Sequence, residues 1–414
     1  MSQISNLPGV STSVDVLIVG AGPAGLAAAV ALRQAGVQNV VIVERQPEAG
    51  GMPRHCGHSP FGMREFHRIL TGAQYVRRLV AAAEQGGARL LLKHTVVSIE
   101  AGPSALIASP DGLLEVRPRA ILLATGVREA ARSAMLVSGS RPPGIMNTAA
   151  LQDMIYIRGM RPFRRPVIIG SELVAMSAIL TCFKAGAKPV AIVEAGPRAL
   201  ARRPFGWLPA ITRIPFYRDT EIAGIDGTDK VIAVHLRNRL TQDTHRLECD
   251  GVLFTGRFTP EAAVARIGGI AIDDGSQGPE IDNRGRTQLP GIYAAGNLLR
   301  GVETAGHCWS EGRRVANVIA RDLKRLPPLS LTRIEAGRGV KYAVPQSIAF
   351  AGDNAAFSHI EVRLSDWIRG NLTVEQAGRT VWQRRLDSGP ERRIRIPLDE
   401  LPRTGADPLV ISAQ

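Results

Sequence analysis

The feature that most constrains this chain is a glycine-rich turn, Gly20-Ala-Gly-Pro-Ala-Gly25. The turn follows an apolar run, residues 14–19, which is typical of a buried parallel strand, and it precedes an alanine-rich stretch that is typical of a helix. A second apolar run, residues 40–43, ends in Glu44. This order is the fingerprint of a βαβ unit that binds a dinucleotide, with the pyrophosphate at the helix N-terminus. The sequence therefore predicts an α/β protein.

Further strands that end in small-residue turns recur along the chain, at residues 120–126, 250–260 and 287–297. In this order they resemble the two-dinucleotide-domain flavoprotein superfamily that includes thioredoxin reductase and ferredoxin reductases. The resemblance covers about residues 14–325, and the length of 414 residues leaves room for two or three domains. It implies two Rossmann-like three-layer domains. The FAD domain (residues 1–148 and 284–328) is interrupted by an NAD(P)-like domain (residues 149–283).

The remaining residues, 329–414, have a different pattern. Apolar and polar residues alternate at Ile360/Val362/Leu364 and at Ile394/Ile396/Leu398, and a turn signal stands at residues 388–390. Alternation of this kind is typical of strands with one solvated face. We expect a small C-terminal antiparallel β module.

The resemblance implies FAD contacts residue by residue. Asn297 stands where the family usually has Asp, and an amide oxygen can still accept the bond from a ribityl hydroxyl. Gly306 and His307, at the start of a helix, would face the flavin pyrimidine. The full set of implied FAD contacts is Gly20, Gly22, Pro23, Ala24, Gly25, Glu44, Arg45, Gly51, Met52, Val96, Ala124, Thr125, Gly126, Gly296, Asn297, Gly306 and His307.

The corresponding turn of the second domain is altered. After the strand 166–169 it reads Gly170-Ser-Glu172-Leu-Val-Ala175, so a glutamate replaces the second glycine. A carboxylate there adds a steric block and like-charge repulsion of roughly 1 to 4 kcal/mol at about 4 Å from a diphosphate. Glu194 keeps the ribose position. We expect NAD(P)H to bind poorly, the alternative being that Glu172 turns outward and a nucleotide still binds.

The four cysteines, Cys56, Cys182, Cys249 and Cys308, are isolated and form no C-x-x-C pair. This excludes a redox dithiol of adjacent cysteines and a cysteine-ligated iron–sulfur or zinc site within this chain. We expect a reducing compartment. Residues 1–13 carry no secretory signal pattern, and the longest uncharged stretch, Val16 to Leu32, is shorter than the roughly 20 apolar residues of a membrane span. The expected location is the cytoplasm, or a membrane surface reached only through partners.

The formal net charge of +14 comes from arginines scattered in pairs, without a run of five or six basic residues. This distribution favours a solvated basic surface over a nucleic-acid partner and leaves an acidic protein or substrate as the alternative.

Residues 50–66 resemble the first subunit of opine oxidases, hydrogen cyanide synthase and dye-linked proline or hydroxyproline dehydrogenases. Residues 339–346 resemble flavoproteins encoded beside glycerol-3-phosphate-dehydrogenase-like subunits.

These resemblances imply an FAD-containing subunit of a heteromeric dehydrogenase that oxidises a small amino, imino or hydroxy acid. A second flavoprotein subunit would oxidise the substrate, with or without a small iron–sulfur subunit. Any FMN or [2Fe-2S] centre would be shared with or carried by those partners. The alternatives are a self-sufficient NAD(P)H-dependent flavin reductase and a non-catalytic flavoprotein scaffold.

Candidate catalytic residues are His55, His58, Glu303 and His307. The spacing of His55, Cys56 and His58 supplies at most three ligands, so no metal is expected. These residues are interpreted as polar groups near the flavin, or as residues that pack a loop or contact a partner. Glu303 and His307 are interpreted as groups for proton handling or for a subunit contact.

Overall fold

The computed structural model describes residues 13–325, 330–349, 355–402 and 407–414. The first domain is built on a five-stranded parallel sheet in the order β19-β7-β1-β2-β3. Its central strand β1 is buried along its whole length, as a strand covered on both faces requires. The strands are β1 (Val16–Val19), β2 (Val40–Glu44), β3 (Arg89–Leu92), β7 (Ala120–Leu123) and β19 (Ile292–Ala294).

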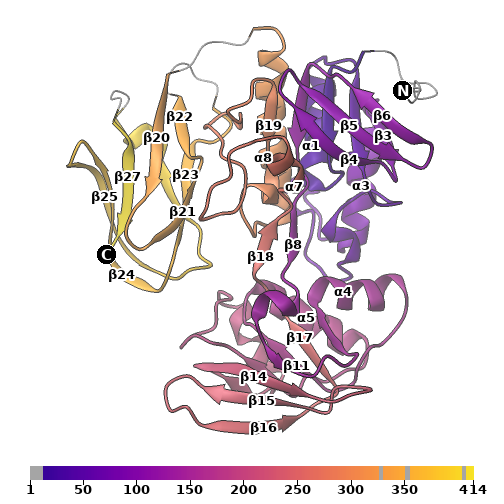
Figure 1. The fold of residues 1–414 in the computed structure, drawn as a ribbon, viewed down its shortest axis with the longest axis vertical. Coiled ribbons are helices and arrows are strands. Elements are labelled where there is room, and N and C mark those ends of the chain that lie inside the picture. Colours follow the sequence, from indigo (N-terminus) through magenta and orange to yellow (C-terminus); the bar gives the residue numbers. More distant parts are fainter. Residues whose placement is uncertain (1–12, 326–329, 350–354, 403–406) are drawn as a thin grey trace.

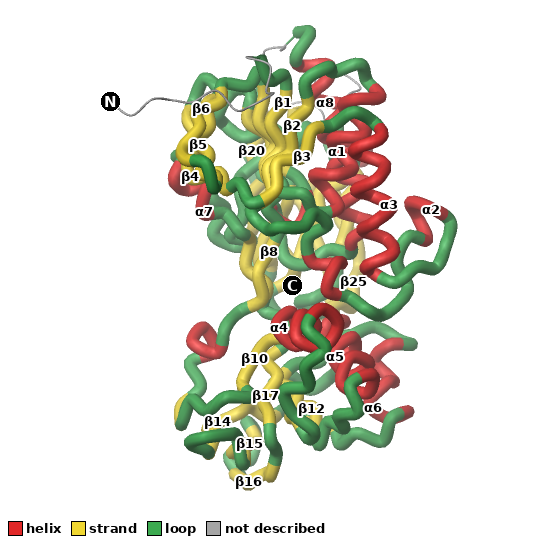
Figure 2. The backbone as a smooth tube through the Cα atoms, turned by 90° about the vertical axis from the view of Figure 1, so that its right-hand side faces the viewer, coloured by secondary structure: helices red, strands yellow, loops and turns green. Residues whose placement is uncertain are grey.

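Two further layers enclose this sheet (Figure 2). Helices α1 (Pro23–Gln34), α3 (Gly72–Gln85) and α8 (Ala305–Asp322) pack on one side. The α1–α8 contact is close, because a Cβ atom at Gly312 would collide with the carbonyl of Ala24. On the other side lies an antiparallel sheet of β4 (Thr95–Glu100), β5 (Ser104–Ser109) and β6 (Gly112–Val116).

The second domain, lower in Figure 1, repeats the parallel arrangement in the order β10-β17-β11-β12-β13. Helices α4 (Thr148–Gln152) and α5 (Leu173–Lys184) accompany it. The parallel strands are β10 (Ile145–Asn147), β11 (Pro166–Ile169), β12 (Ala191–Val193), β13 (Phe216–Tyr217) and β17 (Gly251–Phe254). A four-stranded sheet adds β9 (Ser138–Gly139), β14 (Thr220–Asp226), β15 (Ala233–Asn238) and β16 (Thr244–Glu248).

The chain passes between these domains through β8 (Val127–Glu129) and β18 (Phe258–Pro260), which pair antiparallel. Strands β9 and β10 already pair with the second domain, before residue 148. Helix α7 (Ala263–Ile267) packs on β4 of the first domain, well before residue 284. We therefore propose domain boundaries at β8 and β18, in place of those expected from the sequence. The expected boundary at residues 328 and 329 lies outside the described residues.

The C-terminal module lies beside the first domain and consists of two sheets (Figure 1). The buried residues Ile360, Val362 and Leu364 contribute to its core, as their alternation predicts, but Glu361 and Arg363 between them are buried as well, so the expected solvated face is absent from this strand. One pair, β20 with β27, is parallel, so the module is not antiparallel throughout. Its strands are β20 (Leu331–Ala336), β21 (Val340–Val344), β22 (Ser347–Ala349), β23 (His359–Leu364), β24 (Ile368–Gln376), β25 (Arg379–Ser388), β26 (Ile394–Pro397) and β27 (Leu409–Ala413).

Short helical segments connect these elements. They are η1 (Met52–His55), α2 (Met63–Phe66), η2 (Arg132–Met135), the π-helical turn η3 (Asp153–Ile157), η4 (Phe205–Trp207), α6 (Leu208–Ile211), η5 (Gly296–Leu298) and η6 (Leu398–Glu400). Within the described ranges, no helix combines the length and the apolar character needed to cross a bilayer. The predicted fold class, two Rossmann-like domains with a C-terminal β module, is confirmed.

Candidate cofactor-binding site

The glycine turn after β1 is tightly packed on two sides and open on the third. Gly20 adopts a φ of +107°, and a Cβ atom there would lie 2.5 Å from the Ala124 carbonyl oxygen. A Cβ atom at Gly25 would collide with the carbonyl of Gly20. At Gly22, the N-cap of α1, a Cβ atom would have no non-neighbouring atom within 4 Å. The first-turn N–H groups of α1, which lack intrahelical acceptors, therefore border an open space that suits an anion.

Two further features border the open space at Gly22. The buried carboxylate of Glu44 accepts hydrogen bonds from the N–H groups of Ala21 at 3.0 Å and Gln46 at 2.9 Å. Gly51, with a φ of +61°, crosses the turn so closely that its Cβ would lie 3.0 Å from Gly22 Cα. The following Met52 is exposed. The chain thus crosses the turn where the resemblance places the diphosphate.

The end of β7 forms the adjoining wall. Thr125 Oγ1 donates a hydrogen bond to the Glu261 carbonyl at 2.9 Å, and Gly126 at φ +74° faces open space. Ala124 is buried. Nearby, Val96 is buried in β4, while the exposed Arg45 lies 3.8 Å from the carboxylate of Glu261.

The start of α8 lies beside the loop that follows β19. The N–H of Gly296 donates to Glu311 Oε1 at 2.7 Å. Asn297 closes the loop, because its amide nitrogen donates to the Glu303 carbonyl at 3.1 Å and its amide oxygen accepts from the Glu303 N–H at 2.6 Å. The N–H of His307 is already bonded to the Thr304 carbonyl at 2.9 Å. A ligand at this helix end would therefore meet the earlier N–H groups, such as that of Gly306.

These residues fit an FAD molecule. The space at Gly22 accommodates a pyrophosphate that a side chain would displace, and Glu44 lies at the end of the second strand, where an acid contacts a ribose. Pro23 and Ala24 are the first two residues of α1, immediately after Gly22. The roles of the individual contacts remain predictions.

The corresponding turn of the second domain is filled by its own glutamate. Glu172 is the N-cap of α5, but its side chain turns back over the turn. Its carboxylate accepts a hydrogen bond from Thr255 Oγ1 at 2.9 Å, and a Cβ atom at Gly170 would lie 2.8 Å from Oε2. A Cβ atom at Gly256 would collide with Oε1. Gly126 and Gly256 follow equivalent strands, yet only Gly126 faces open space.

The neighbouring acid position is occupied in the same way. Glu194 accepts a hydrogen bond from the hydroxyl of the buried Ser171 and another from the Gly196 N–H at 2.8 Å. Burial raises the pKa of Glu172 to about 7 and also raises the pKa of Glu194. The carboxylate of Glu391, from the C-terminal module, contributes to both rises.

The C-terminal module reaches this second turn through an aromatic contact. Two guanidinium groups lie over the Trp367 ring, with Arg198 Cζ 5.5 Å and Arg392 Cζ 5.2 Å from its centre. Arg198 belongs to the loop after β12, and the other two residues belong to the module. Sequence reasoning missed Trp367 and Glu391, because nothing local marks a contact between segments so distant along the chain.

Of the candidate catalytic residues, His55 and His58 lie together in the loop around η1. His55 Nδ1 is 3.4 Å from Asp153 Oδ1, which joins this loop to η3. Burial lowers the pKa of both histidines and raises the pKa of the Cys56 thiol to about 12. Over the described part of the chain, no three or more His, Cys, Asp or Glu residues gather as a metal-binding group.

Glu303 and His307 form a separate group at the start of α8. The Glu303 carboxylate binds Arg363 at 2.5 Å and Arg393 at 2.7 Å, and Arg393 also contacts His307 Nε2. Burial, followed by the nearby Arg393, lowers the pKa of His307 to about 4. Both arginines come from the C-terminal module, and sequence reasoning missed them. Among the residues that the structure describes, no hydrogen bond or ion pair links this group directly to His55 or His58.

A buried ion cluster lies next to this group. Arg300, which is 2% exposed, donates from Nη2 to Glu311 at 2.7 Å and from Nε to Glu361 at 2.9 Å. Glu361 belongs to β23, so the cluster joins the module to the first domain. The nearby Arg300 guanidinium, with Arg393 and Arg395, outweighs burial and lowers the pKa of Glu361 to about 2.

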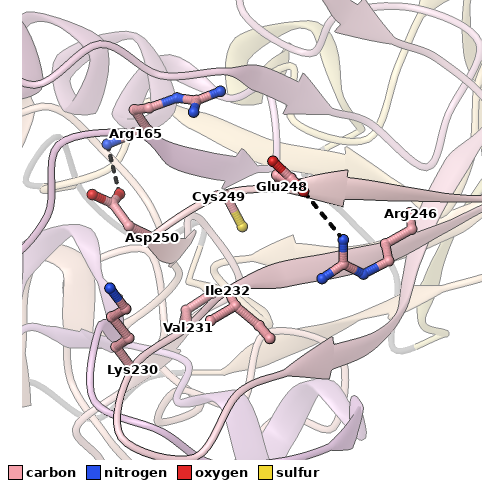
Figure 3. Close-up of a pocket in the computed structure, with 8 residues that line it drawn as sticks. All are labelled: Arg165, Lys230, Val231, Ile232, Arg246, Glu248, Cys249 and Asp250. Carbon is pink, nitrogen blue, oxygen red and sulfur yellow. Dashed lines mark hydrogen bonds and ion pairs between the residues drawn. The ribbon is translucent and has the colours of Figure 1, made fainter.

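A cavity of about 290 Å³ lies elsewhere, at the amino ends of β11 and β17 (Figure 3). Four of its polar residues bond in pairs: Asp250 accepts from the Arg165 N–H at 2.6 Å, and Arg246 pairs with Glu248 at 3.6 Å. Ligands of open parallel sheets bind at the carboxyl ends of the strands. The cavity therefore lies at the opposite edge from the glycine turn.

Comparison with known proteins agrees with this geometry. A family model described as "Pyridine nucleotide-disulphide oxidoreductase" matches residues 14–312. An opine oxidase subunit of Rhizobium meliloti (strain 1021) is 26% identical over 341 residues, which cover 75% of this chain and 72% of that protein. Thioredoxin reductase of Mycolicibacterium smegmatis is 27% identical over 290 residues, 69% of this chain and 88% of that protein.

The fold agrees as well. The crystal structure of T. acidophilum thioredoxin reductase superposes with a TM-score of 0.64 at 22% identity, covering 75% of this chain and 99% of that chain. The superfamily predicted from the glycine turns is thus confirmed. The chain belongs to the pyridine nucleotide-disulphide oxidoreductase family and is an FAD-dependent oxidoreductase.

Proposed function

We propose that this chain is the FAD-containing subunit of a heteromeric dehydrogenase for a small amino, imino or hydroxy acid. It would relay electrons from a flavoprotein subunit that oxidises the substrate to a partner flavin or iron–sulfur centre. The observation that carries the proposal is the contrast between the two glycine turns. Gly126 faces open space, whereas the Glu172 carboxylate occupies the equivalent space at Gly256. NAD(P)H would have to displace that carboxylate and break its bond to Thr255.

The block at the second turn is steric first and electrostatic second. With a pKa of about 7, Glu172 is partly protonated at neutral pH, so charge repulsion alone is incomplete there. Its side chain fills the space in either protonation state. The described cysteines offer no alternative route for electrons to the flavin, since all four are free thiols and Cys182, Cys249 and Cys308 are buried. One relative, the opine oxidase protein of Rhizobium meliloti, is itself named as a subunit.

In this function the first domain holds the cofactor and the C-terminal module shapes its surroundings. Gly22, Gly51 and Glu44 would bind the diphosphate and the adenosine ribose. When bound, FAD supplies reversible one- and two-electron chemistry. His307 is neutral at pH 7 because its pKa is about 4. Its ring therefore holds one proton and one lone pair, and Arg393 fixes its orientation at Nε2.

The test is anaerobic mixing of the FAD-loaded chain with NADH or NADPH, followed at the flavin absorbance. We expect little bleaching. The variant Glu172→Gly should bleach at least about tenfold faster, because one such block corresponds to about 1.4 kcal/mol or more. Glu194→Gln, which keeps the glutamate at position 172, is the matched control and should remain slow. Rapid stoichiometric bleaching of the unaltered chain would overturn the proposal and favour a self-sufficient flavin reductase.

A further inference from the structure

The imidazole of His307 lies between two guanidinium groups from different parts of the chain. Arg393, which precedes β26, contacts Nε2, and Arg64 Nη1 on α2 lies 3.4 Å from Nδ1. Arg64 is exposed and His307 is half-buried, so solvent reaches the group. Figure 2 shows α2 at the edge of the molecule, outside α3.

This arrangement leaves at least one hydrogen-bond donor of the group without an acceptor. A neutral imidazole has one N–H and one acceptor nitrogen, whereas a guanidinium only donates. One of the two contacts of His307 therefore sets a donor against a donor. Protonation of the ring would add a second donor and does not resolve the conflict. An acceptor with negative charge, placed against Arg64 and the ring, resolves it.

The carboxylates nearby are already engaged. Glu303 is shared by Arg363 and Arg393, and Glu361 lies 3.8 Å from Arg393 while binding Arg300. Glu65 accepts a hydrogen bond from Tyr75 at 2.8 Å. In the portion of the chain that the structure describes, Arg64 has no carboxylate within ion-pair distance, and the buried Nη1 of Arg363 has no acceptor.

We propose that Arg64, His307 and Arg393 form a binding site for a small anion, either a carboxylate or a phosphate group. A guanidinium binds both groups through two parallel N–H donors, and the two arginines contact different nitrogens of the ring. The proposed function assigns oxidation of the substrate acid to a partner subunit, so it does not identify this anion. Binding of the anion rests on the contacts of these three side chains alone.

The experiment uses the FAD-loaded full-length chain with ¹³C-labelled histidine, observed by NMR. The His307 ring signal is identified by its absence from His307→Gln. Separate titrations use acetate, inorganic phosphate and, at matched ionic strength, sodium chloride. At saturation we expect the pKa of His307 to rise from about 4 by at least about one unit, since an opposite charge comes within reach of the ring.

Two variants separate the site from general charge. Arg64→Gln should weaken binding of the anion at least about tenfold. Arg64→Lys keeps the charge but loses the paired N–H donors of the guanidinium, so its affinity should lie between those of Arg64→Gln and the unaltered chain. Arg68→Gln is the matched control, because Arg68 is also exposed and belongs to the same segment. It should bind as the unaltered chain does.

The outcomes are distinct. A saturable response to acetate alone supports a carboxylate ligand, and one to phosphate alone supports a phosphate ligand. The absence of any saturable response, an equal response to chloride, or equal losses in Arg64→Gln and Arg68→Gln would overturn the proposed site. FAD content and NADH bleaching are measured on the same samples, so a failure of the proposed function is recognised separately.

Discussion

Single residues decide which of the two glycine turns is open. In the first domain a missing side chain at Gly22 leaves the space above α1 free, and in the second domain the side chain of Glu172 closes it. The two turns are otherwise alike. Each follows a parallel strand, begins with a glycine and has an acid at the end of the next strand. The difference is therefore local and can be tested one residue at a time.

Substitution of Gly22 by alanine should remove FAD without unfolding the chain. A Cβ atom there would have no non-neighbouring atom within 4 Å, and the backbone is extended at φ −79°, so the stability should change by about 1 kcal/mol or less. The methyl group would occupy the pyrophosphate space, and FAD affinity should fall at least about tenfold. The ratio of flavin to protein absorbance and the urea unfolding curve measure the two effects.

Gly25→Ala is the contrasting variant, because its Cβ would collide with the Gly20 carbonyl. It should lose both stability and FAD. If Gly22→Ala retained FAD as well as the unaltered chain does, the pyrophosphate does not lie above Gly22.

Glu172→Gln should stabilise the chain in a pH-dependent way. Because burial raises the folded pKa of Glu172 to about 7, above the ordinary value near 4.5, the folded state keeps a proton that the unfolded state has lost. The stability of the unaltered chain therefore declines as pH rises from about 4.5 to 7 and then levels off. We expect Gln to be more stable by about 1 to 3 kcal/mol at pH 8 and by much less at pH 5.

Urea unfolding of both proteins between pH 5 and pH 8 measures this difference. Glu221→Gln, at an exposed ion pair, is the control and should show no such trend. A stability difference that stays constant across this range would show that Glu172 is ionised throughout.

At the scale of elements, the sequence correctly predicted strands and helices that are marked by a local pattern of residues. The strand expected at residues 14–19 is β1 from Val16, and the helix expected to start at Gly306 and His307 is α8, which begins at Ala305. Continuous apolar runs and flanking glycines carry these predictions, because both signals lie within one element. The obstructed turn at Glu172 was visible for the same reason.

Contacts between distant elements could not be predicted in this way. Arg393 and Trp367 lie outside the alternating runs of the C-terminal module and have no local signal, yet they contact His307 and Arg198. The parallel pairing of β20 with β27 and the entry of β9 and β10 into the second domain depend on tertiary packing. No local periodicity encodes the partner of a strand.

Trp367→Leu should loosen the segment between β12 and α6. Its ring supplies the face on which Arg198 stacks, a contact of about 1 kcal/mol, so amide exchange near Arg198 should quicken about fivefold. Trp382→Leu is the control, because Trp382 contacts Arg384 and Glu400 within the module alone. Hydrogen exchange read by mass spectrometry compares the two. Equal exchange near Arg198 in both variants would contradict the contact.

At the scale of the whole molecule, the C-terminal module is joined to the first domain by buried charges. Arg300 contacts Glu311 of α8 and Glu361 of β23, and Glu311 in turn holds the Gly296 N–H. A buried ion pair adds little net stability by itself, but loss of one partner leaves the other charged and unsolvated. The cluster therefore enforces the position of the module more than it strengthens the fold. That position brings Arg393 and Arg363 to Glu303.

Arg300→Met should consequently destabilise the chain by about 3 to 5 kcal/mol, because Glu311 and Glu361 lose their common partner in a buried site. Adding Glu361→Leu removes one of the two carboxylates that have lost Arg300 and should recover part of the lost stability. Arg333→Met is the control, because its pair with Glu280 is exposed and should be worth about 1 kcal/mol or less. Urea unfolding compares the three variants with the unaltered chain. The His307 ring signal, measured in the same variants, should move with Arg300→Met but not with Arg333→Met, since only the former change frees the module that carries Arg393. A His307 signal unchanged in a destabilised Arg300→Met would show that Arg393 is held at α8 without the cluster.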